Sequence, residues 1–168
     1  MILIALGANL PSSAGPPVAT LRAALARLER QGVKILSVSS FYETPAWPNP
    51  AQPPFVNAVA IAQTTLQPVE LLTLLHGVET AFGRLRSASN APRTLDIDLL
   101  DYEGRIVSEG VVLPHPRMTG RSFVLVPLAE IAPDWRDPVS GQSVGDLLAA
   151  LPDRDIPKLT QDRSGSLL

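Results

Sequence analysis

The sequence has 168 residues, of which 45% are hydrophobic and 18% charged, which suits one compact domain with a sizeable core. It contains no cysteine, so disulfides and thiolate zinc sites are excluded, and we expect a cytoplasmic location. The net charge of −2 at pH 7 argues against nucleic-acid binding. The N-terminal run MILIALGANL is too short for a membrane span and lacks the basic residues of a signal sequence, so we expect no membrane association.

The first half of the chain predicts two strands around a helix. Ile2 to Leu6 is a continuous apolar run, which is typical of a buried strand. Apolar residues then recur at helical spacing from Val18 to Leu28. Val33 to Tyr42 is rich in β-branched and aromatic residues and predicts one strand. The proline-rich segment 43–54 that follows is a long loop, and such loops often cover a site.

The second half continues this alternation. Phe55 to Thr65 predicts a strand, Pro68 to Phe82 a second amphipathic helix, and the residues around 95–100 another strand. This order is the βαββαβ pattern of a ferredoxin-like α+β fold. Two short helices are predicted over 123–132 and 144–151. We expect one domain over residues 1–151 and a mobile tail over 152–168.

The stretch GRLRSASNAPRTLDIDLL, residues 83–100, combines arginines with a pair of aspartates. Aliphatic residues alternate with Asp96 and Asp98, so on a strand both carboxylates share one face. An Asp-x-Asp pair alone is more often a solvated face, but neighbouring carboxylates also suit a divalent cation. Arginines bind phosphate with two donors at once, which favours a metal-chelated polyphosphate here. The arginines of this loop are Arg84, Arg86 and Arg93.

Other polar residues have two interpretations each. His115 and Arg121 flank a turn and are either surface residues or an extension of the phosphate site. Asn57 interrupts an apolar strand face, where an unpaired amide costs about 1–3 kcal/mol. Its donor and acceptor suit the edge of a heteroaromatic ring. In isolation, a capping or solvent-exposed role is the simpler expectation for Glu79.

An aromatic side chain near Asn57 would complete a site for such a ring. Phe55, Phe123 and Trp47 are candidates for stacking, although core packing is the simpler role for the two phenylalanines. The sequence contains neither a phosphate-loop motif nor a nucleophile elbow. In-line transfer to a bound acceptor, with charge stabilisation by metal and arginines, is the mechanism that remains.

Several segments in one order resemble the hydroxymethyl-dihydropterin pyrophosphokinases. They span roughly residues 1 to 135 and are ALGANL, SSFYETPAW, QPPFVNAV, VETAFGRLR, APRTLDIDLL, LPHPR and GRSFVLVPLAEIAP. Enzymes of this folate-pathway family move a pyrophosphoryl group from ATP to 6-hydroxymethyl-7,8-dihydropterin and release AMP. The resemblance implies the same reaction, a ferredoxin-like fold, and loops 43–54 and 84–93 that close over the substrates.

The resemblance also implies roles for individual residues. Asp96 and Asp98 would hold two Mg²⁺ ions and form the catalytic set with Arg84 and Arg93. The residues expected to bind ATP are His76, Glu79, Arg84, Arg86, Arg93, His115 and Arg121. Those expected to bind the pterin are Thr44, Pro45, Ala46, Phe55, Asn57 and Phe123, with the two phenylalanine rings on either side of it.

Three positions depart from the family pattern, and several questions stay open. Ser89 replaces a residue that is often basic, Asn90 stands where some members have tryptophan, and His76 stands where some have glutamine. The proton acceptor is either Asp98 or a metal-bound hydroxide. Two other functions are alternatives to the pyrophosphokinase. One is another magnesium-dependent nucleotidyl or glycosyl transferase, and the other is a ferredoxin-like module that senses a nucleotide without turnover. We expect a monomer with no second folate enzyme fused to it.

Overall fold

The computed structural model describes residues 1–152 and 156–160. Its elements in chain order are β1 (Ile2–Ala8), α1 (Pro17–Arg30), β2 (Lys34–Val38), β3 (Tyr42–Thr44), β4 (Phe55–Gln63), α2 (Pro68–Ala81), β5 (Asp96–Tyr102), η1 (Met118–Gly120), α3 (Ser122–Ile131), α4 (Val144–Ala149) and β6 (Lys158–Leu159).

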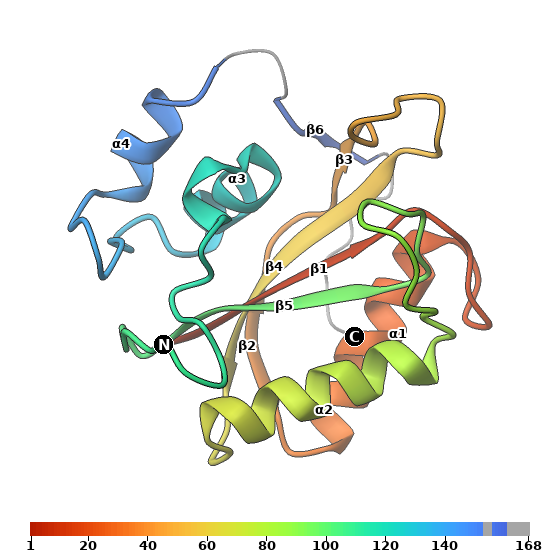
Figure 1. The fold of residues 1–168 in the computed structure, drawn as a ribbon, viewed down its shortest axis with the longest axis horizontal. Helices are drawn as coiled ribbons and strands as arrows, with labels where there is room; N and C mark the ends of the chain where they lie inside the picture. The colour runs from red at the N-terminus through yellow and green to blue at the C-terminus, as the bar shows by residue number, and fades with distance from the viewer. Residues whose placement is uncertain (153–155, 161–168) are drawn as a thin grey trace.

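In the described ranges the strands form one antiparallel sheet of six. Strand β1 lies between β5 and β4, and β4 pairs on its other side with both β2 and β3. Figure 1 shows α1 and α2 on one side of this sheet and α3 and α4 on the other. Leaving the short β3 and β6 aside, the order β5-β1-β4-β2 with two helices on one face is ferredoxin-like, which confirms the predicted α+β class.

The strand predicted over Val33–Tyr42 is instead two strands, β2 and β3. The chain leaves the β2 ladder near Ser39, whose hydroxyl accepts a hydrogen bond from Val59 N at 3.0 Å and donates one to Ser40 O at 2.8 Å. A register shift between Ile35 and Ser37 bends β2 before that point. The prediction of one strand was wrong because this break depends on contacts with β4, which local composition does not encode.

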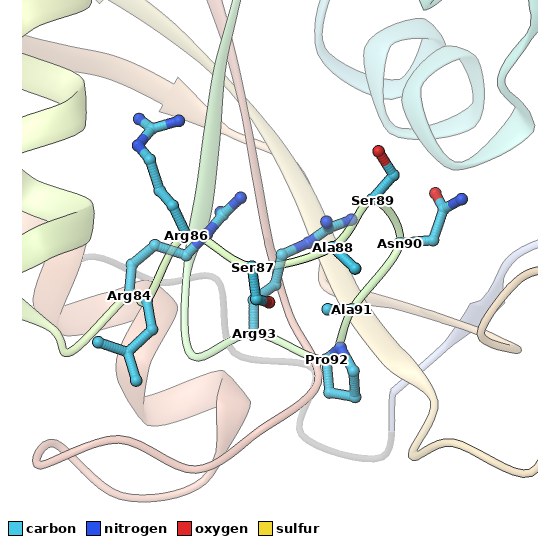
Figure 2. Close-up of a pocket in the computed structure, with 10 residues that line it drawn as sticks. Arg84, Arg86, Ser87, Ala88, Ser89, Asn90, Ala91, Pro92 and Arg93 are labelled. Carbon is cyan, nitrogen blue, oxygen red and sulfur yellow. The ribbon is translucent and has the colours of Figure 1, made fainter.

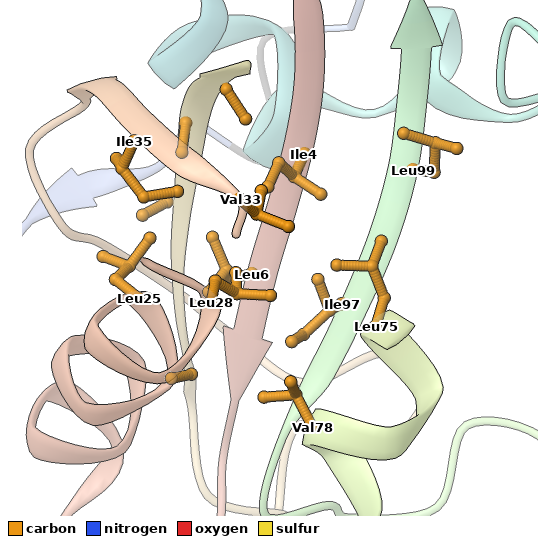
Figure 3. Packing of buried hydrophobic residues seen from close by; sticks show 14 of the residues in the cluster. Ile4, Leu6, Leu25, Leu28, Val33, Ile35, Leu75, Val78, Ile97 and Leu99 are labelled. Atoms are coloured by element: carbon orange, nitrogen blue, oxygen red, sulfur yellow. The ribbon is translucent and has the colours of Figure 1, made fainter. Parts of the chain in front are cut away.

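The larger core fills the space between the sheet and helices α1 and α2. Figure 3 shows residues of these helices, of β1 and of β5 meeting there. The labelled examples are Ile4, Leu6, Leu25, Leu28, Val33, Ile35, Leu75, Val78, Ile97 and Leu99. At full burial, each such side chain contributes about 1.5–3 kcal/mol of hydrophobic stabilisation.

The opposite face of the sheet has a smaller core under α3 and α4. Leu3, Val59 and Leu100 from three neighbouring strands pack there against Leu125 and Trp135, among others. This helical cover is only partial, because the aspartates of β5 lie on the same face and stay accessible.

The C-terminal segment contributes to the edge of the sheet. Strand β6 pairs with β3, with Leu159 opposite Tyr42. The mobile tail predicted over 152–168 falls mainly on 153–155 and 161–168, which lie outside the described residues. No helix within 1–152 or 156–160 combines the length and apolar character that a membrane span requires.

Candidate functional site

The two aspartates of β5 lie side by side on the face that α3 leaves open. Leu95, Ile97 and Leu99 are at most 3% exposed and pack into the larger core. The side chains of Asp96 and Asp98 are 26% and 33% exposed. The alternation in the sequence therefore predicted correctly which face each residue occupies.

Asp96 is held by two arginines of loop 84–93. Arg84 Nη1 donates to Asp96 Oδ1 at 2.9 Å and to the carbonyl oxygen of Leu95 at 2.8 Å. Arg93 Nε lies 3.2 Å from Asp96 Oδ2, yet this buried nitrogen has no aligned hydrogen-bond partner among the described residues. The contact of Arg93 with Asp96 is therefore one of charge, and its Nε–H is a buried donor without an aligned acceptor among the described residues.

The loop itself encloses a hollow of about 210 Å³ lined by residues 84–93. Figure 2 shows Ser89 and Asn90 at the tip of the loop and its three arginines along the two arms. Asn90 has a φ of 62°, a left-handed conformation that asparagine tolerates better than most residues.

Asp98 faces a second pair of basic residues. His115 Nε2 lies 3.9 Å and Arg121 Nη1 3.6 Å from Asp98 Oδ2. Burial and the neighbouring charge of Asp96 raise the pKa of Asp98, while His115 and Arg121 oppose that rise. Burial is also the main reason that the pKa of His115 is lowered from 6.5. The lowered pKa favours the neutral form of His115, so Arg121 supplies most of the positive charge at Asp98.

Glu79 is buried, so the expectation of a capping or solvent-exposed role was wrong. It is 3% exposed, and its Oε1 accepts a hydrogen bond from Ile97 N at 2.8 Å. Arg84 and Arg86 approach the carboxylate at 3.6 and 3.7 Å. Burial raises the pKa of Glu79 to about 7, although these partners favour the charged form. Glu79 therefore links α2 to the strand that carries the aspartates.

His76 lies on the exposed side of α2, one turn before Glu79. Partial burial, together with the charges of Arg86 and Arg84, lowers the pKa of His76. It shares the electrostatic surroundings of loop 84–93, so the fold brings it to the side of the site expected for the nucleotide.

The outer edge of β5 is the scaffold for these groups. On this edge the Leu95 carbonyl accepts from Arg84, the Ile97 N–H donates to Glu79, and the Leu100 carbonyl accepts from His115 N at 2.8 Å. In a larger sheet these backbone groups would pair with a further strand. Here they fix the side chains of Arg84 and Glu79 and the position of the His115 backbone.

Most of the residues predicted to bind the pterin lie around the N-terminal end of β4. Asn57 is 7% exposed, and its Nδ2 donates to Thr44 Oγ1 at 2.9 Å. Ala46 is buried, and Pro45 beside it is exposed. Trp47, the third stacking candidate, is 75% exposed.

Two arginines connect the aspartates with the two phenylalanines. The guanidinium of Arg93, beside Asp96, lies 5.1 Å from the centre of the Phe55 ring. That of Arg121, near Asp98, lies 5.4 Å from the Phe123 ring, which also packs against the α3 core. Both are cation–π distances. The acidic pair and the two rings therefore belong to one site.

The family model described as 7,8-dihydro-6-hydroxymethylpterin-pyrophosphokinase (HPPK) matches residues 3–133. The chain belongs to this family. The 2-amino-4-hydroxy-6-hydroxymethyldihydropteridine pyrophosphokinase of Synechocystis sp. is 41% identical over 148 residues, which are 87% of this chain and 73% of the relative. The protein of the same name from Methylorubrum extorquens is 42% identical over 145 residues, or 85% of this chain and 90% of the relative.

A solved structure agrees in fold with this pyrophosphokinase-family chain. The crystal structure of wild-type Plasmodium falciparum HPPK-DHPS matches with a TM-score of 0.69 at 14% identity. The match covers 88% of this chain but only 40% of that longer chain. At this identity the likeness supports the ferredoxin-like fold of the pyrophosphokinase domain alone.

Sequence reasoning missed Asn9, which joins both loops of the candidate site. Asn9 Oδ1 accepts from Arg93 N at 2.8 Å, and Asn9 Nδ2 donates to the Pro53 carbonyl at 3.1 Å. Its own N–H donates to the Arg93 carbonyl at 3.1 Å. The signal was present, since Asn9 lies in the matched segment ALGANL, directly after a strand, where a buried amide needs partners.

Proposed function

We propose that this protein transfers the pyrophosphoryl group of ATP to the hydroxymethyl group of 6-hydroxymethyl-7,8-dihydropterin, releasing AMP, in folate biosynthesis. Membership of the pyrophosphokinase family supports the reaction. The observation that carries the assignment to this site is the double bridge of Arg93 and Arg121 between the aspartates and the phenylalanine rings. Such a site accepts a charged polyphosphate beside an aromatic ring.

We assign two Mg²⁺ ions to Asp96 and Asp98. No group of three or more histidine, aspartate or glutamate side chains within the described ranges is placed to hold a metal on its own. Two partly exposed carboxylates on one face fit Mg²⁺, which keeps water and phosphate oxygens as most of its ligands. Bound there, the ions would neutralise the phosphate charge that develops during transfer.

The basic residues around the pair would bind the triphosphate. Arg84 and Arg93 flank Asp96 and Arg121 lies near Asp98, so their guanidinium groups can hold non-bridging oxygens on both sides. Arg93 lies between Asp96 and the Phe55 ring, so it would bind the phosphates on the side of the acceptor. Arg86, His76, Glu79 and His115 complete the proposed ATP side.

The pterin would lie between Phe55 and Phe123, with Asn57 and the backbone of residues 44–46 at its polar edge. Its hydroxymethyl oxygen attacks the β-phosphorus, the bond from that phosphorus to the oxygen shared with the α-phosphate breaks, and AMP leaves with that oxygen. We assign no obligatory protein base. Asp98 and a metal-bound hydroxide are the two candidate acceptors of the hydroxyl proton.

The proposal includes one catalytic domain over residues 1–151 that acts as a monomer in the cytoplasm. The smaller core supports these bounds, since Leu147, Leu148 and Leu151 pack into it with α3. The absence of cysteine suits a reducing compartment. Sedimentation of the purified protein at several concentrations tests the monomer.

The test is the identity of the product. Wild-type protein and Asp98→Ala are incubated with ATP, Mg²⁺ and 6-hydroxymethyl-7,8-dihydropterin, and adenine nucleotides are separated. We expect AMP that depends on the pterin and on magnesium, and loss of at least 1,000-fold in rate with Asp98→Ala, roughly 4 kcal/mol of barrier. Formation of ADP would mean a different phosphoryl transfer. ATP binding by both proteins without turnover would indicate a nucleotide sensor.

A further inference from the structure

The residues of β1 on the face of the site become smaller towards the aspartates. Leu3 is fully buried in the core under α3, Ala5 packs at the margin of that core, and Gly7 has no side chain. Period-two alternation places these three residues on one face. Side chains of β1 therefore fill the space beneath α3, whereas β1 contributes no side chain at Gly7, where the site lies.

Gly7 occupies the position between the amide and the first aspartate. It is directly opposite Asn57 on β4 and directly opposite Asp96 on β5. Residues opposite each other in an antiparallel sheet share a face, and neighbouring strands are about 4.8 Å apart. The backbones of Asn57 and Asp96 are thus roughly 10 Å apart, with a floor free of β1 side chains between them.

A side chain at position 7 would collide with Asn57. A Cβ built on Gly7 lies 2.8 Å from Asn57 Oδ1, a distance that real Cβ atoms essentially never show. The next nearest atoms are Val56 O at 3.8 Å and Asn57 Cγ at 3.9 Å, so the crowding comes from β4. The Asn57 amide cannot simply move away, because Thr44 holds its Nδ2 at 2.9 Å.

We propose that Gly7 is a specificity-determining residue for the acceptor, which is a heteroaromatic ring carrying a hydroxymethyl group. The absence of a side chain at Gly7 allows the Asn57 carboxamide to lie over β1, where the carboxamide would form hydrogen bonds with the edge of the ring. It also leaves the floor open between that ring and the phosphates held near Asp96. The inference rests on the proposed function and adds a residue to its acceptor side.

The first test separates acceptor binding from nucleotide binding. For Gly7→Ala we expect the Kd of 6-hydroxymethyl-7,8-dihydropterin, measured with a non-hydrolysable ATP analogue present, to rise at least tenfold. The Kd of the analogue itself should change less than twofold, since the collision is on the β4 side. Gly145→Ala is the matched control, because the nearest atom to its new Cβ is Ser143 Oγ at 3.8 Å. An unchanged pterin Kd in Gly7→Ala would overturn the inference.

A double-mutant cycle tests the cause. Asn57→Ala removes the colliding oxygen, so adding Gly7→Ala to it should cost less than a further twofold in pterin affinity. Losses that multiply would show that Gly7 acts without Asn57, against the inference. If Gly7→Ala alone fails to fold, thermal melting of Gly7→Ala/Asn57→Ala decides: recovery supports the collision, and continued failure contradicts it.

The same experiments distinguish this inference from the proposed function. Wild-type protein that forms no AMP from ATP and the pterin would end the proposed function and the inference with it. Wild-type and Gly7→Ala proteins that form AMP with equal pterin affinity would leave the proposed function intact and overturn the inference alone.

Discussion

Ile97 and Asp98 are neighbours on one strand with opposite surroundings. Ile97 is 2% exposed and packs into the larger core, whereas Asp98 points to the other face beside His115 and Arg121. The first face is covered by two long helices and the second only in part by α3. The larger core under α1 and α2 therefore provides most of the hydrophobic stabilisation, and the other face of the sheet can carry several charged groups close together.

The partly buried carboxylates around β5 have an energetic consequence. Burial and Asp96 raise the pKa of Asp98, and burial raises that of Glu79, which reaches the edge of β5 from α2, to about 7, so both carboxylates are less stable as anions than in water. Removing charge from these carboxylates should therefore leave the protein equally or more stable, while removing volume from the larger core should weaken it. Four predictions test that contrast.

The largest expected effect is on activity, from Asp98→Asn. The substitution keeps the shape of the side chain but removes a proposed metal ligand, so we expect kcat/KM to fall at least 1,000-fold, about 4 kcal/mol. The free energy of unfolding at pH 8 should stay the same or rise, because a strained charge is lost. Chemical denaturation measures this, and a clear drop in stability would break the contrast between the faces.

Ile97→Ala should do the reverse. A truncated side chain leaves a cavity in the larger core, and we expect the free energy of unfolding to fall by about 3 kcal/mol. At a temperature where the variant is still folded, both KM values should stay within threefold of wild type. Urea titration and steady-state kinetics provide the two readings; selective loss of nucleotide binding would show that the faces are not independent.

Glu79→Gln tests the pH dependence. The pKa of Glu79 is about 7 in the folded protein and near 4.5 otherwise, so the folded state binds this proton more tightly. Its stabilisation is complete below pH 4.5 and is lost as pH rises through 7. Between pH 5.5 and 8 the wild type should lose on the order of 2 kcal/mol more stability than Glu79→Gln. Parallel pH profiles for the two proteins would count against a buried, titrating Glu79.

The smallest effect should come from Arg86→Ala. The Arg86 side chain is 68% exposed and lies 3.7 Å from Glu79, so we expect the free energy of unfolding to change by less than about 0.5 kcal/mol. The KM for ATP should still rise several-fold at low salt, and the effect should shrink at 0.5 M NaCl because of screening. A salt-independent change would point to packing instead.

The sequence alone was sufficient where a pattern is local. Alternation around Asp96 and Asp98 predicted the two faces of β5, and helical spacing predicted α1 and α2 within a few residues. The failures depend on distant partners. The split of β2 from β3 depends on the bond between Ser39 and Val59.

Distant partners also explain the missed site residues. Glu79 is buried where its carboxylate accepts a hydrogen bond from the N–H of Ile97, which lies on a strand that follows it in the chain. Asn9 acquires its role from residues on two loops far along the chain, and the short strand β6 pairs with the distant β3. No local pattern signals such contacts, whereas a family motif that includes Asn9 does.

The occupied edge of β5 has a consequence for solubility. A strand edge with free N–H and C=O groups can recruit another chain into intermolecular β-sheet. Arg84 and Glu79 bind these groups at Leu95 and Ile97, and the chain at His115 binds Leu100. The side chains proposed to serve ATP therefore also occupy part of this edge, and truncating Arg84 would free the Leu95 carbonyl for pairing with another chain in the same step that weakens nucleotide binding.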